Sequence, residues 1–372
     1  MSDINRREFC SVTLGCCSLL SVPVLSSAQE KAADPRDLVE ARYYEKLPNR
    51  KIRCKLCPRE CLIDDLERGY CGVRENIGGT YYSLVYGKPC TAHIDPIEKK
   101  PLFHFLPGTS AFSLATVGCN VMCKFCQNWE ISQATPEQVQ SFDLLPYDLA
   151  LLAKKRGCAS IAYTYSEPVI FTEYMYDSAV QGNERGVRSV MITNGYINPE
   201  PMRDLCDVLS GVKIDLKAFT ERFYKELVAG ELRPVLDTLV LLRKLDMWTE
   251  IVYLVIPGQN DDSKELAALS AWIYKELGPD TPVHFSRFHP QYRLKNLPST
   301  PLKTLKTARQ IALDSGLHFV YTGNVPGDPG ENTYCPSCGK TVIRRVGFSV
   351  IDISLNKGAC AACGSLIAGV WS

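Results

Sequence analysis

The amino-acid sequence predicts an α/β protein, a partial (β/α) barrel with one cysteine-rich module on each side of it. Three observations support this fold class. Between residues 111 and 325, short apolar runs alternate with helical stretches, and such alternation is typical of parallel strands joined by crossover helices. Residues 51–110 and residues 330–372 lack this alternation. Each of these two segments instead contains a group of four cysteines.

The composition is that of an ordinary globular protein. Of 372 residues, 45% are apolar and 22% are charged, which argues against a disordered or fibrous chain. Lysine plus arginine number 42 and aspartate plus glutamate number 41, so no basic excess supports binding to nucleic acid. No apolar run reaches the roughly 20 residues of a membrane-spanning helix, and we expect no stable membrane span. The unusual number is 17 cysteines.

The first 50 residues precede the predicted folded modules. Residues 1–28 carry Arg6 and Arg7, followed by a mildly apolar stretch that ends in small residues. This pattern resembles a twin-arginine export signal, and a frayed apolar N-terminus is the alternative. Residues 29–50 are polar and contain two prolines, so we interpret them as a linker.

The barrel region contains seven candidate strands and seven candidate helices, assigned from apolar periodicity and turn residues. The candidate strands are residues 112–117, 160–164, 189–193, 212–216, 249–256, 283–285 and 318–321. The candidate helices are residues 147–156, 169–183, 201–210, 222–228, 235–245, 263–277 and 301–314. Because six or seven strand–helix units follow one another, we expect an open or closed barrel.

The first candidate strand runs directly into three cysteines, Cys119, Cys123 and Cys126, separated by three and then two residues. A 4Fe–4S cluster is normally held by four thiolates. Three thiolates would leave one iron with an open coordination position, which a catalytic metal needs and a structural metal lacks. Taken alone, the spacing also fits a zinc knuckle or three buried thiols.

This spacing after a strand, with the aromatic Phe125 before the last cysteine, resembles the radical S-adenosylmethionine (SAM) superfamily. The resemblance implies a radical SAM core over residues 111–325. It also implies a 4Fe–4S cluster whose open iron binds SAM and whose electron cleaves it to a 5′-deoxyadenosyl radical, which abstracts hydrogen from a substrate. The sequence Tyr-Ser-Glu-Pro at 165–168 resembles the Gly-Gly-Glu-Pro element of the superfamily. By that resemblance, Glu167 would accept hydrogen bonds from the SAM ammonium.

Polar residues also follow the next candidate strands, and catalytic groups of such barrels gather at the carboxyl ends of strands. Asn194 ends the third strand, where it could reach the ligand. Asp215 and Lys217 end the fourth, where Lys217 could pair with the SAM carboxylate and Asp215 with the ribose or the ammonium. Pro257 ends the fifth, as a candidate wall for the adenine. Each alone also fits an ordinary loop, but their occurrence at successive strand ends favours a site.

Longer runs narrow the resemblance to one branch. CQNWEIS at 126–132, DPIEKKPL at 95–102 and HFLPG at 104–108 resemble the pyruvate formate-lyase activating enzyme branch. HFSRFHP at 284–290 and the paired-cysteine tail resemble the AmmeMemoRadiSam radical enzyme. The resemblance covers nearly all of residues 51–372. It implies AmmeMemo-type proteins as candidate partners and an electron donor of the flavodoxin or ferredoxin class, and it implies no particular substrate.

Two other functions remain as alternatives. The first is an activating enzyme that abstracts hydrogen from a glycine of a partner enzyme, although nothing in this sequence points to such a partner. The second is a non-catalytic iron–sulfur electron carrier or metal-binding scaffold, against which the three-cysteine group argues.

The eight flanking cysteines form two groups of four. The C-terminal group is Cys335, Cys338, Cys360 and Cys363, and the N-terminal group is Cys54, Cys57, Cys61 and Cys71. The C-terminal group consists of two matched pairs, and the residues between them could form a hairpin of 342–345 against 349–353. Such spacing predicts a zinc ribbon, with two disulfides as the alternative. The N-terminal group could hold zinc or an auxiliary 4Fe–4S cluster.

The location of the protein stays open at this point. The leader predicts export, to the periplasm or tethered to the membrane. The supply of SAM and of low-potential electrons favours the cytoplasm instead.

Overall fold

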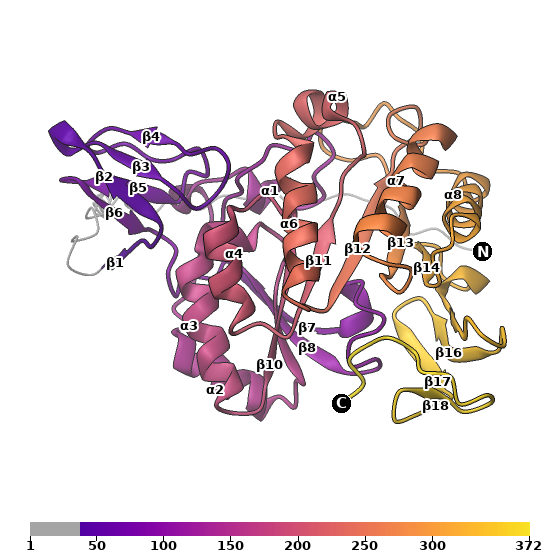
Figure 1. Cartoon of the computed structure of the whole chain (residues 1–372). Helices are drawn as coiled ribbons and strands as arrows, with labels where there is room; N and C mark the ends of the chain where they lie inside the picture. Colours follow the sequence, from indigo (N-terminus) through magenta and orange to yellow (C-terminus); the bar gives the residue numbers. More distant parts are fainter. Residues whose placement is uncertain (1–37) are drawn as a thin grey trace, which may run out of the picture. The chain divides into compact units, whose positions relative to one another are not determined.

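The computed structural model describes residues 38–372 (Figure 1). The predicted leader over residues 1–28 and the first part of the predicted linker lie outside the described residues. Within the described range, no helix is both long enough and apolar enough to cross a membrane.

The core of the described chain is an eight-stranded sheet. Its order is β14–β13–β12–β11–β10–β9–β8–β7, so every strand pairs with the next one along the chain. The strands are β7 Thr91–Pro96, β8 Ser110–Ala115, β9 Ser160–Tyr163, β10 Arg188–Thr193, β11 Gly211–Asp215, β12 Thr249–Val255, β13 Val283–Arg287 and β14 Val320–Gly323. Strands β8 to β14 are mutually parallel. The predicted fold class is confirmed, and all seven candidate strands are present.

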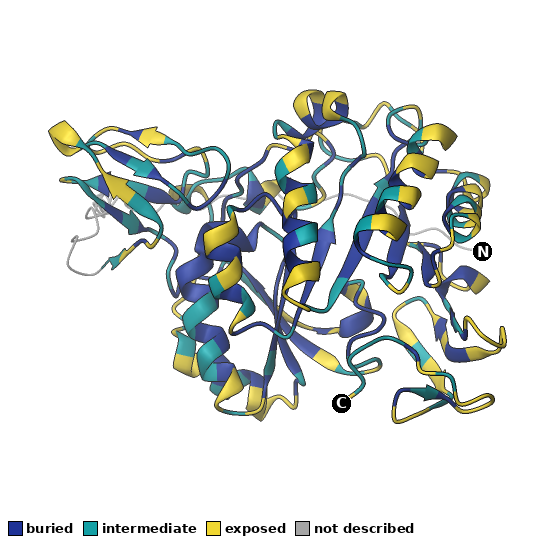
Figure 2. Cartoon of the chain, in the orientation of Figure 1, coloured by how far each residue is buried: buried dark blue, intermediate teal, exposed yellow. Residues whose placement is uncertain are grey.

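Helices follow the parallel strands and bury one face each against the sheet, as Figure 2 shows. They are α1 Trp129–Ser132, α2 Pro146–Lys155, α3 Thr172–Asn183, α4 Pro199–Cys206, α5 Glu221–Phe223, α6 Leu232–Lys244, α7 Ser263–Glu276 and α8 Leu302–Asp314. A π-helical turn, η6 Tyr224–Val228, continues α5. Short 3₁₀ turns are η2 Pro48–Arg50, η3 Ile97–Lys99, η4 Pro136–Gln138, η5 Pro168–Phe171 and η7 Pro329–Glu331.

Strand β7 was not predicted, and it lies within the range assigned to the N-terminal module. It pairs antiparallel with β8 along its full length, from Thr91 opposite Ala115 to Pro96 opposite Ser110. Its outer edge is not paired in the described chain. Its one buried residue is the charged Asp95, whereas Ile94 is exposed, so the run has no apolar signature of a buried strand. The sheet therefore begins before residue 111, and β7 brings Asp95 to it.

The N-terminal module consists of two small antiparallel sheets, β2–β3–β4 and β1–β6–β5. Their strands are β1 Val39–Glu40, β2 Tyr44–Lys46, β3 Ile52–Cys54, β4 Leu62–Ile63, β5 Arg74–Ile77 and β6 Thr80–Ser83. The linker prediction for 29–50 is wrong from residue 38 onward, because β1 and β2 are edge strands of these sheets. Two polar side chains between these strands reach the barrel helices: Arg42 donates to Asp177, and the Tyr43 hydroxyl donates to Asp204.

The C-terminal module contains the predicted hairpin. Strands β16 Thr341–Val346 and β17 Ser349–Ile353 pair antiparallel, and β15 Thr333–Tyr334 joins them. Strands β18 Leu355–Asn356 and β19 Ala359–Cys360 form a second small pair. The end of the chain returns to the barrel, where Val370 exchanges backbone hydrogen bonds with His104 and Leu106.

Candidate functional site

The predicted cysteine loop lies at the carboxyl end of β8 and carries Cys119, Cys123 and Cys126. Two backbone hydrogen bonds tie the loop to the π-helical turn: the Met122 N–H donates to Val228 and the Lys124 N–H donates to Leu227, both at 2.8 Å. Phe125 is buried and packs on Phe223, with ring centroids 5.7 Å apart. The loop is therefore held in place by backbone contacts and one aromatic side chain.

The three thiols are buried to different degrees and chemically distinct. Burial raises the pKa of Cys119 well above its ordinary value, and it raises the pKa of Cys123 to about 12 although the nearby Lys217 ammonium opposes it. The Cys126 sulfur lies 3.1 Å from the Ser132 hydroxyl. Because ligand thiols must be deprotonated, a metal centre here would release protons on binding.

Glu167 joins the carboxyl ends of two neighbouring strands. Its buried carboxylate accepts hydrogen bonds from the Thr193 hydroxyl, the Val169 N–H at 3.1 Å and the Asn194 N–H at 2.8 Å. Burial raises the pKa of Glu167 to about 7, although the three donors lower it. Both carboxylate oxygens are thus engaged by the protein, and the predicted contact with a SAM ammonium stays a prediction.

The residues before Glu167 keep a backbone suited to glycine. Tyr165 has a φ of 64°, in the left-handed region that glycine favours. Its hydroxyl donates to Asp95, and its carbonyl accepts from the Asn128 side chain at 2.8 Å. The Ser166 hydroxyl donates to the Thr116 carbonyl at 2.7 Å. These contacts connect the three sequence runs that contain Asp95, Asn128 and Tyr165, and they hold the strained residue in place.

Asn194 lies against the cysteine loop. Its side-chain amide donates to Asn120 at 2.9 Å, and its side-chain oxygen accepts from the Tyr196 N–H at 2.8 Å. Asn120 in turn donates to the Tyr196 carbonyl at 2.7 Å. Asn120 is therefore a site residue that sequence reasoning missed, although its position directly after Cys119 was a signal.

Asp215 and Lys217 come together at the end of β11, and Lys213 joins them. Asp215 accepts from Lys213 and, at 3.1 Å, from Lys217. Burial opposes the charge on Asp215, but the two lysines hold its pKa at about 2. Lys213 is buried, and it was missed because it lies inside an apolar strand. The positive charge of Lys217 also lowers the pKa of Cys123, so this charged group acts on the cysteine loop.

A second buried charged group stands at the β7 end of the sheet. Asp95 accepts from Lys99 at 2.8 Å and from Lys100 at 2.5 Å. Burial lowers the pKa of Lys100 to about 8, against the pairing with Asp95, and Lys213 repels it further. Pro257, which follows β12, makes no hydrogen bond or ion pair with either group.

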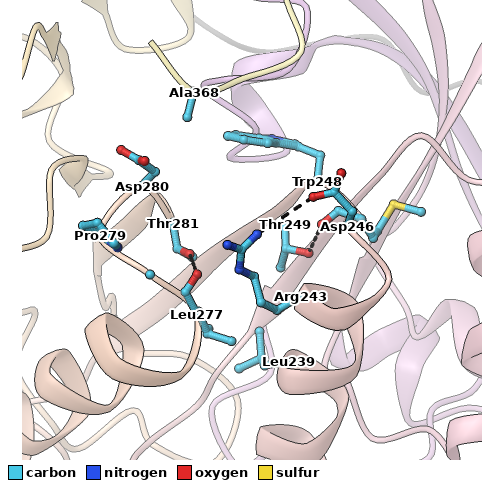
Figure 3. A pocket seen from close by; sticks show the side chains of 12 residues that line it. Leu239, Arg243, Asp246, Trp248, Thr249, Leu277, Pro279, Asp280, Thr281 and Ala368 are labelled. Atoms are coloured by element: carbon cyan, nitrogen blue, oxygen red, sulfur yellow. Dashed lines mark hydrogen bonds and ion pairs between the residues drawn. The ribbon is translucent and has the colours of Figure 1, made fainter. Parts of the chain in front are cut away.

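A pocket of about 280 Å³ lies at the opposite end of the strands (Figure 3). Arg243, Trp248, Asp280 and Ala368 line it, together with Thr249, the first residue of β12. Catalytic groups of a strand–helix barrel lie at the carboxyl ends of the strands. This pocket is thus separate from the cysteine loop, and we assign it no role.

The four C-terminal cysteines form a compact set that could bind a metal ion. Their four sulfurs lie within 4.8 Å of one another, with 3.6 Å between Cys335 and Cys363 and 3.8 Å between Cys338 and Cys360. Tetrahedral zinc with bonds of about 2.3 Å separates its sulfurs by roughly 3.8 Å. The neighbouring Ser365 lowers the pKa of Cys363 to about 6. The predicted metal-binding geometry is confirmed, and zinc as the metal stays a prediction.

Comparisons with known proteins agree with this geometry. The sequence profile described as the Radical SAM superfamily matches residues 113–269. An uncharacterized protein of Methanocaldococcus jannaschii is 46% identical over 330 residues, which cover 88% of this chain and 98% of that protein. The pyruvate formate-lyase 1-activating enzyme of Escherichia coli strain K12 is 22% identical over 180 residues, 46% of this chain and 71% of that enzyme.

Among solved structures, a radical SAM methyltransferase from Sphaerobacter thermophilus aligns with a TM-score of 0.46 and 15% identity. The alignment covers 61% of this chain and 71% of that chain. The profile match spans the strand before the cysteine loop, the loop itself and the strand ends that carry Glu167, Asn194 and Lys217. On the strength of this match, the chain contains a radical SAM domain over residues 113–269.

Proposed function

We propose that the protein is an enzyme that holds a 4Fe–4S cluster on Cys119, Cys123 and Cys126 and binds SAM beside it. The single observation that carries the proposal is the position of this loop at the carboxyl end of β8, next to Asn194 and Lys217. When bound, such a cluster supplies the electron that cleaves SAM to a 5′-deoxyadenosyl radical, which abstracts hydrogen from the substrate. The donor set fits, because it offers three thiols and a neighbouring lysine cation.

The chain's own residues have separable roles in this proposal. Lys217 is the candidate partner of the SAM carboxylate, because its side chain is 18% exposed and its positive charge lowers the pKa of Cys123. Asp215 orients Lys217 through their ion pair at 3.1 Å. Glu167 holds the ends of β9 and β10 together by accepting from the Asn194 N–H. The Asn194 side chain in turn donates to Asn120 and so fixes the cysteine loop relative to β10. Pro257 remains the candidate adenine wall.

The substrate and the cellular system are a further part of the proposal. The runs at 284–290 and the paired-cysteine tail support an AmmeMemo-type system with AmmeMemo-type partner proteins. A flavodoxin- or ferredoxin-class protein would supply the electron. An activating enzyme for a glycyl-radical partner remains the second enzymatic candidate, supported by the similarity to the Escherichia coli enzyme.

Product formation tests the cluster assignment. The triple variant Cys119→Ala, Cys123→Ala, Cys126→Ala should form no 5′-deoxyadenosine after anaerobic reconstitution and reduction. Cys206→Ala is the matched control, because Cys206 is a lone cysteine on α4, and it should keep the activity of the parent. Formation of 5′-deoxyadenosine by the triple variant would show that the assignment is wrong.

Ligand binding tests Lys217. Lys217→Ala should weaken SAM binding roughly ten- to a hundred-fold, since a charge-assisted hydrogen bond contributes about 1.5–3 kcal/mol. Calorimetry measures the affinity, and iron analysis checks that the cluster content is unchanged. Lys225→Ala, at an exposed position of the π-helical turn, is the control. Equal affinities of Lys217→Ala and the control would remove Lys217 from the SAM site.

A further inference from the structure

The four N-terminal cysteines line one small cavity between their module and the barrel. Cys54, Cys57, Cys61 and Cys71 share this cavity with Arg74 and Asn120. It contains about 300 Å³ of space outside the atoms, of which about 20 Å³ admits the centre of a water molecule. The smaller of these two volumes is far below the roughly 300 Å³ of a small ligand pocket, so the cavity suits a small group bonded directly to the sulfurs.

The spread of these sulfurs differs from that of a single-ion site. Of all described residues, only the C-terminal cysteines form a set of ligand atoms within 4.8 Å of one another. A single tetrahedral zinc ion needs its sulfurs roughly 3.8 Å apart. In a 4Fe–4S cluster each thiolate binds a different iron, so its sulfurs stand further apart. The N-terminal group therefore fits a cluster better than one zinc ion.

Arg74 adds a buried donor that no protein group uses. The side chain is 0% exposed, its Nε donates to the Ile170 carbonyl at 2.9 Å, and its Nη2 pairs with Glu173. The remaining nitrogen, Nη1, is buried and has no hydrogen-bond partner in the described chain. Leaving a buried donor unsatisfied costs about 1–3 kcal/mol. Since Arg74 lines the cysteine cavity, a sulfur-rich anionic group there would accept from it.

The cavity also adjoins the loop that carries the first cluster. A side chain added at Gly118 would place its Cβ 2.8 Å from the Cys71 carbonyl oxygen, so the two backbones are in contact. The Arg59 guanidinium donates to the Asn120 and Ala229 carbonyls. The backbone of Cys71 is therefore packed directly against the loop that carries Cys119.

From these observations we propose that Cys54, Cys57, Cys61 and Cys71 bind a second, fully coordinated 4Fe–4S cluster, and that Arg74 Nη1 donates a hydrogen bond to it. Each of the four irons would have a cysteine thiolate as its ligand, so this cluster would have no open coordination position for SAM. The proposal concerns the binding site alone and holds whether or not the first cluster cleaves SAM.

Metal analysis of the anaerobically purified full chain tests the proposal. The quadruple variant Cys54→Ser, Cys57→Ser, Cys61→Ser, Cys71→Ser should lose about four irons and four sulfides per chain and keep its zinc. Cys158→Ser, at a lone buried cysteine, should lose neither. A loss of about one zinc with unchanged iron would show a single-ion site, and unchanged iron and zinc would show that these cysteines hold no metal. Either result overturns the proposal.

A measurement on the unaltered protein covers the case in which the quadruple variant fails to fold. The electron paramagnetic resonance spectrum of the reduced protein should contain two 4Fe–4S signals, one that changes on adding SAM and one that does not. A single signal would overturn the proposal. The triple variant of Cys119, Cys123 and Cys126 should lose SAM cleavage and keep the SAM-insensitive signal. This result separates the two proposals.

Arg74→Lys tests the donor. Lysine keeps the positive charge beside Glu173 and removes the guanidinium Nη1. Because hydrogen bonds to the sulfurs help set the reduction potential, the SAM-insensitive signal should persist with a lower midpoint potential. An unchanged potential would remove Arg74 from the site.

Discussion

The two flanking groups of four cysteines offer the same ligands in different surroundings. The C-terminal sulfurs lie 3.6–3.8 Å apart in pairs, and Cys338 and Cys363 are exposed. Cys54 and Cys57 are buried instead, and the N-terminal group surrounds a cavity that Arg74 also lines. The C-terminal group stands beside a short hairpin, whereas the N-terminal group is packed between its module and the barrel. The cysteine spacing in the sequence predicts that each group of four sulfurs converges on a metal centre. The packing around the sulfurs decides how large a metal centre each group can hold.

The largest expected effect concerns the four C-terminal cysteines. Replacing all four C-terminal cysteines with alanine should remove about one zinc per chain and unfold residues 330–372. Structural zinc supplies about 10–16 kcal/mol of apparent binding free energy in small zinc domains, and this module has only a small core of its own. Zinc analysis and limited proteolysis measure the result, with Cys206→Ala as the control. Retained zinc and retained protease resistance would contradict the single-ion interpretation.

The next effect concerns the buried arginine of the N-terminal group. Arg74→Met should lower the free energy of unfolding by about 3–5 kcal/mol, because it leaves the Glu173 carboxylate buried without its partner. Arg222→Met removes an exposed partner of Glu226 and should cost less than about 1 kcal/mol. Denaturant unfolding measures both changes. If both variants lost the same free energy of unfolding, the ion pair between Arg74 and Glu173 would not be a buried contact.

Much of the barrel could be predicted from the sequence because its strands are local apolar runs. All seven parallel strands and the hairpin 341–353 follow from such runs. Strand β7 was missed, since its polar residues become a strand only by pairing with β8. Residues 38–50 were mistaken for a linker for the same reason, because β1 and β2 are short edge strands whose partners are distant in sequence.

The candidate site was predictable where a residue stands in a motif and unpredictable where its role depends on packing. Cys119, Glu167 and Lys217 follow strands directly, so their positions could be read from the sequence. Lys213 could not, because it lies inside a buried strand whose sequence does not reveal which residue contacts a carboxylate. The unpaired Nη1 of Arg74 was likewise unpredictable, because it depends on packing that pairs Nε with Ile170 and Nη2 with Glu173.

Acid pH should weaken the attachment of the C-terminal module. His104 donates from Nδ1 to the Ala368 carbonyl at 2.6 Å, so its Nε2 accepts from the Tyr321 hydroxyl. Burial lowers the pKa of His104 from 6.5 to about 4, with Glu250 opposing and Arg345 reinforcing the shift. The unfolded chain therefore binds a proton that the folded chain does not between these values. The free energy of unfolding should be fully retained above pH 6.5 and fall by about 3 kcal/mol as the pH approaches 4.

Unfolding curves over this pH range measure the effect, with His104→Gln as the comparison. Glutamine can replace both hydrogen bonds and has no titrating group, so its curve should lack this part of the pH slope. Metal loss at low pH affects both proteins alike and cancels in the difference. Identical slopes would show that His104 does not control the attachment.

The smallest effect separates backbone preference from close packing. Gly339 follows the Cys335–Cys338 pair with a φ of 71° and has no atom within 4 Å of an added Cβ. Gly339→Ala should therefore cost only about 1 kcal/mol, the penalty of alanine in the left-handed region. Gly118 has a φ of 97°, and its added Cβ would also lie 2.8 Å from the Cys71 carbonyl oxygen. Gly118→Ala should cost more than Gly339→Ala in denaturant unfolding, because the N-terminal module must move away from the cysteine loop. If both changes cost the same, the N-terminal module does not contact the cysteine loop at Gly118 as closely as the structure shows.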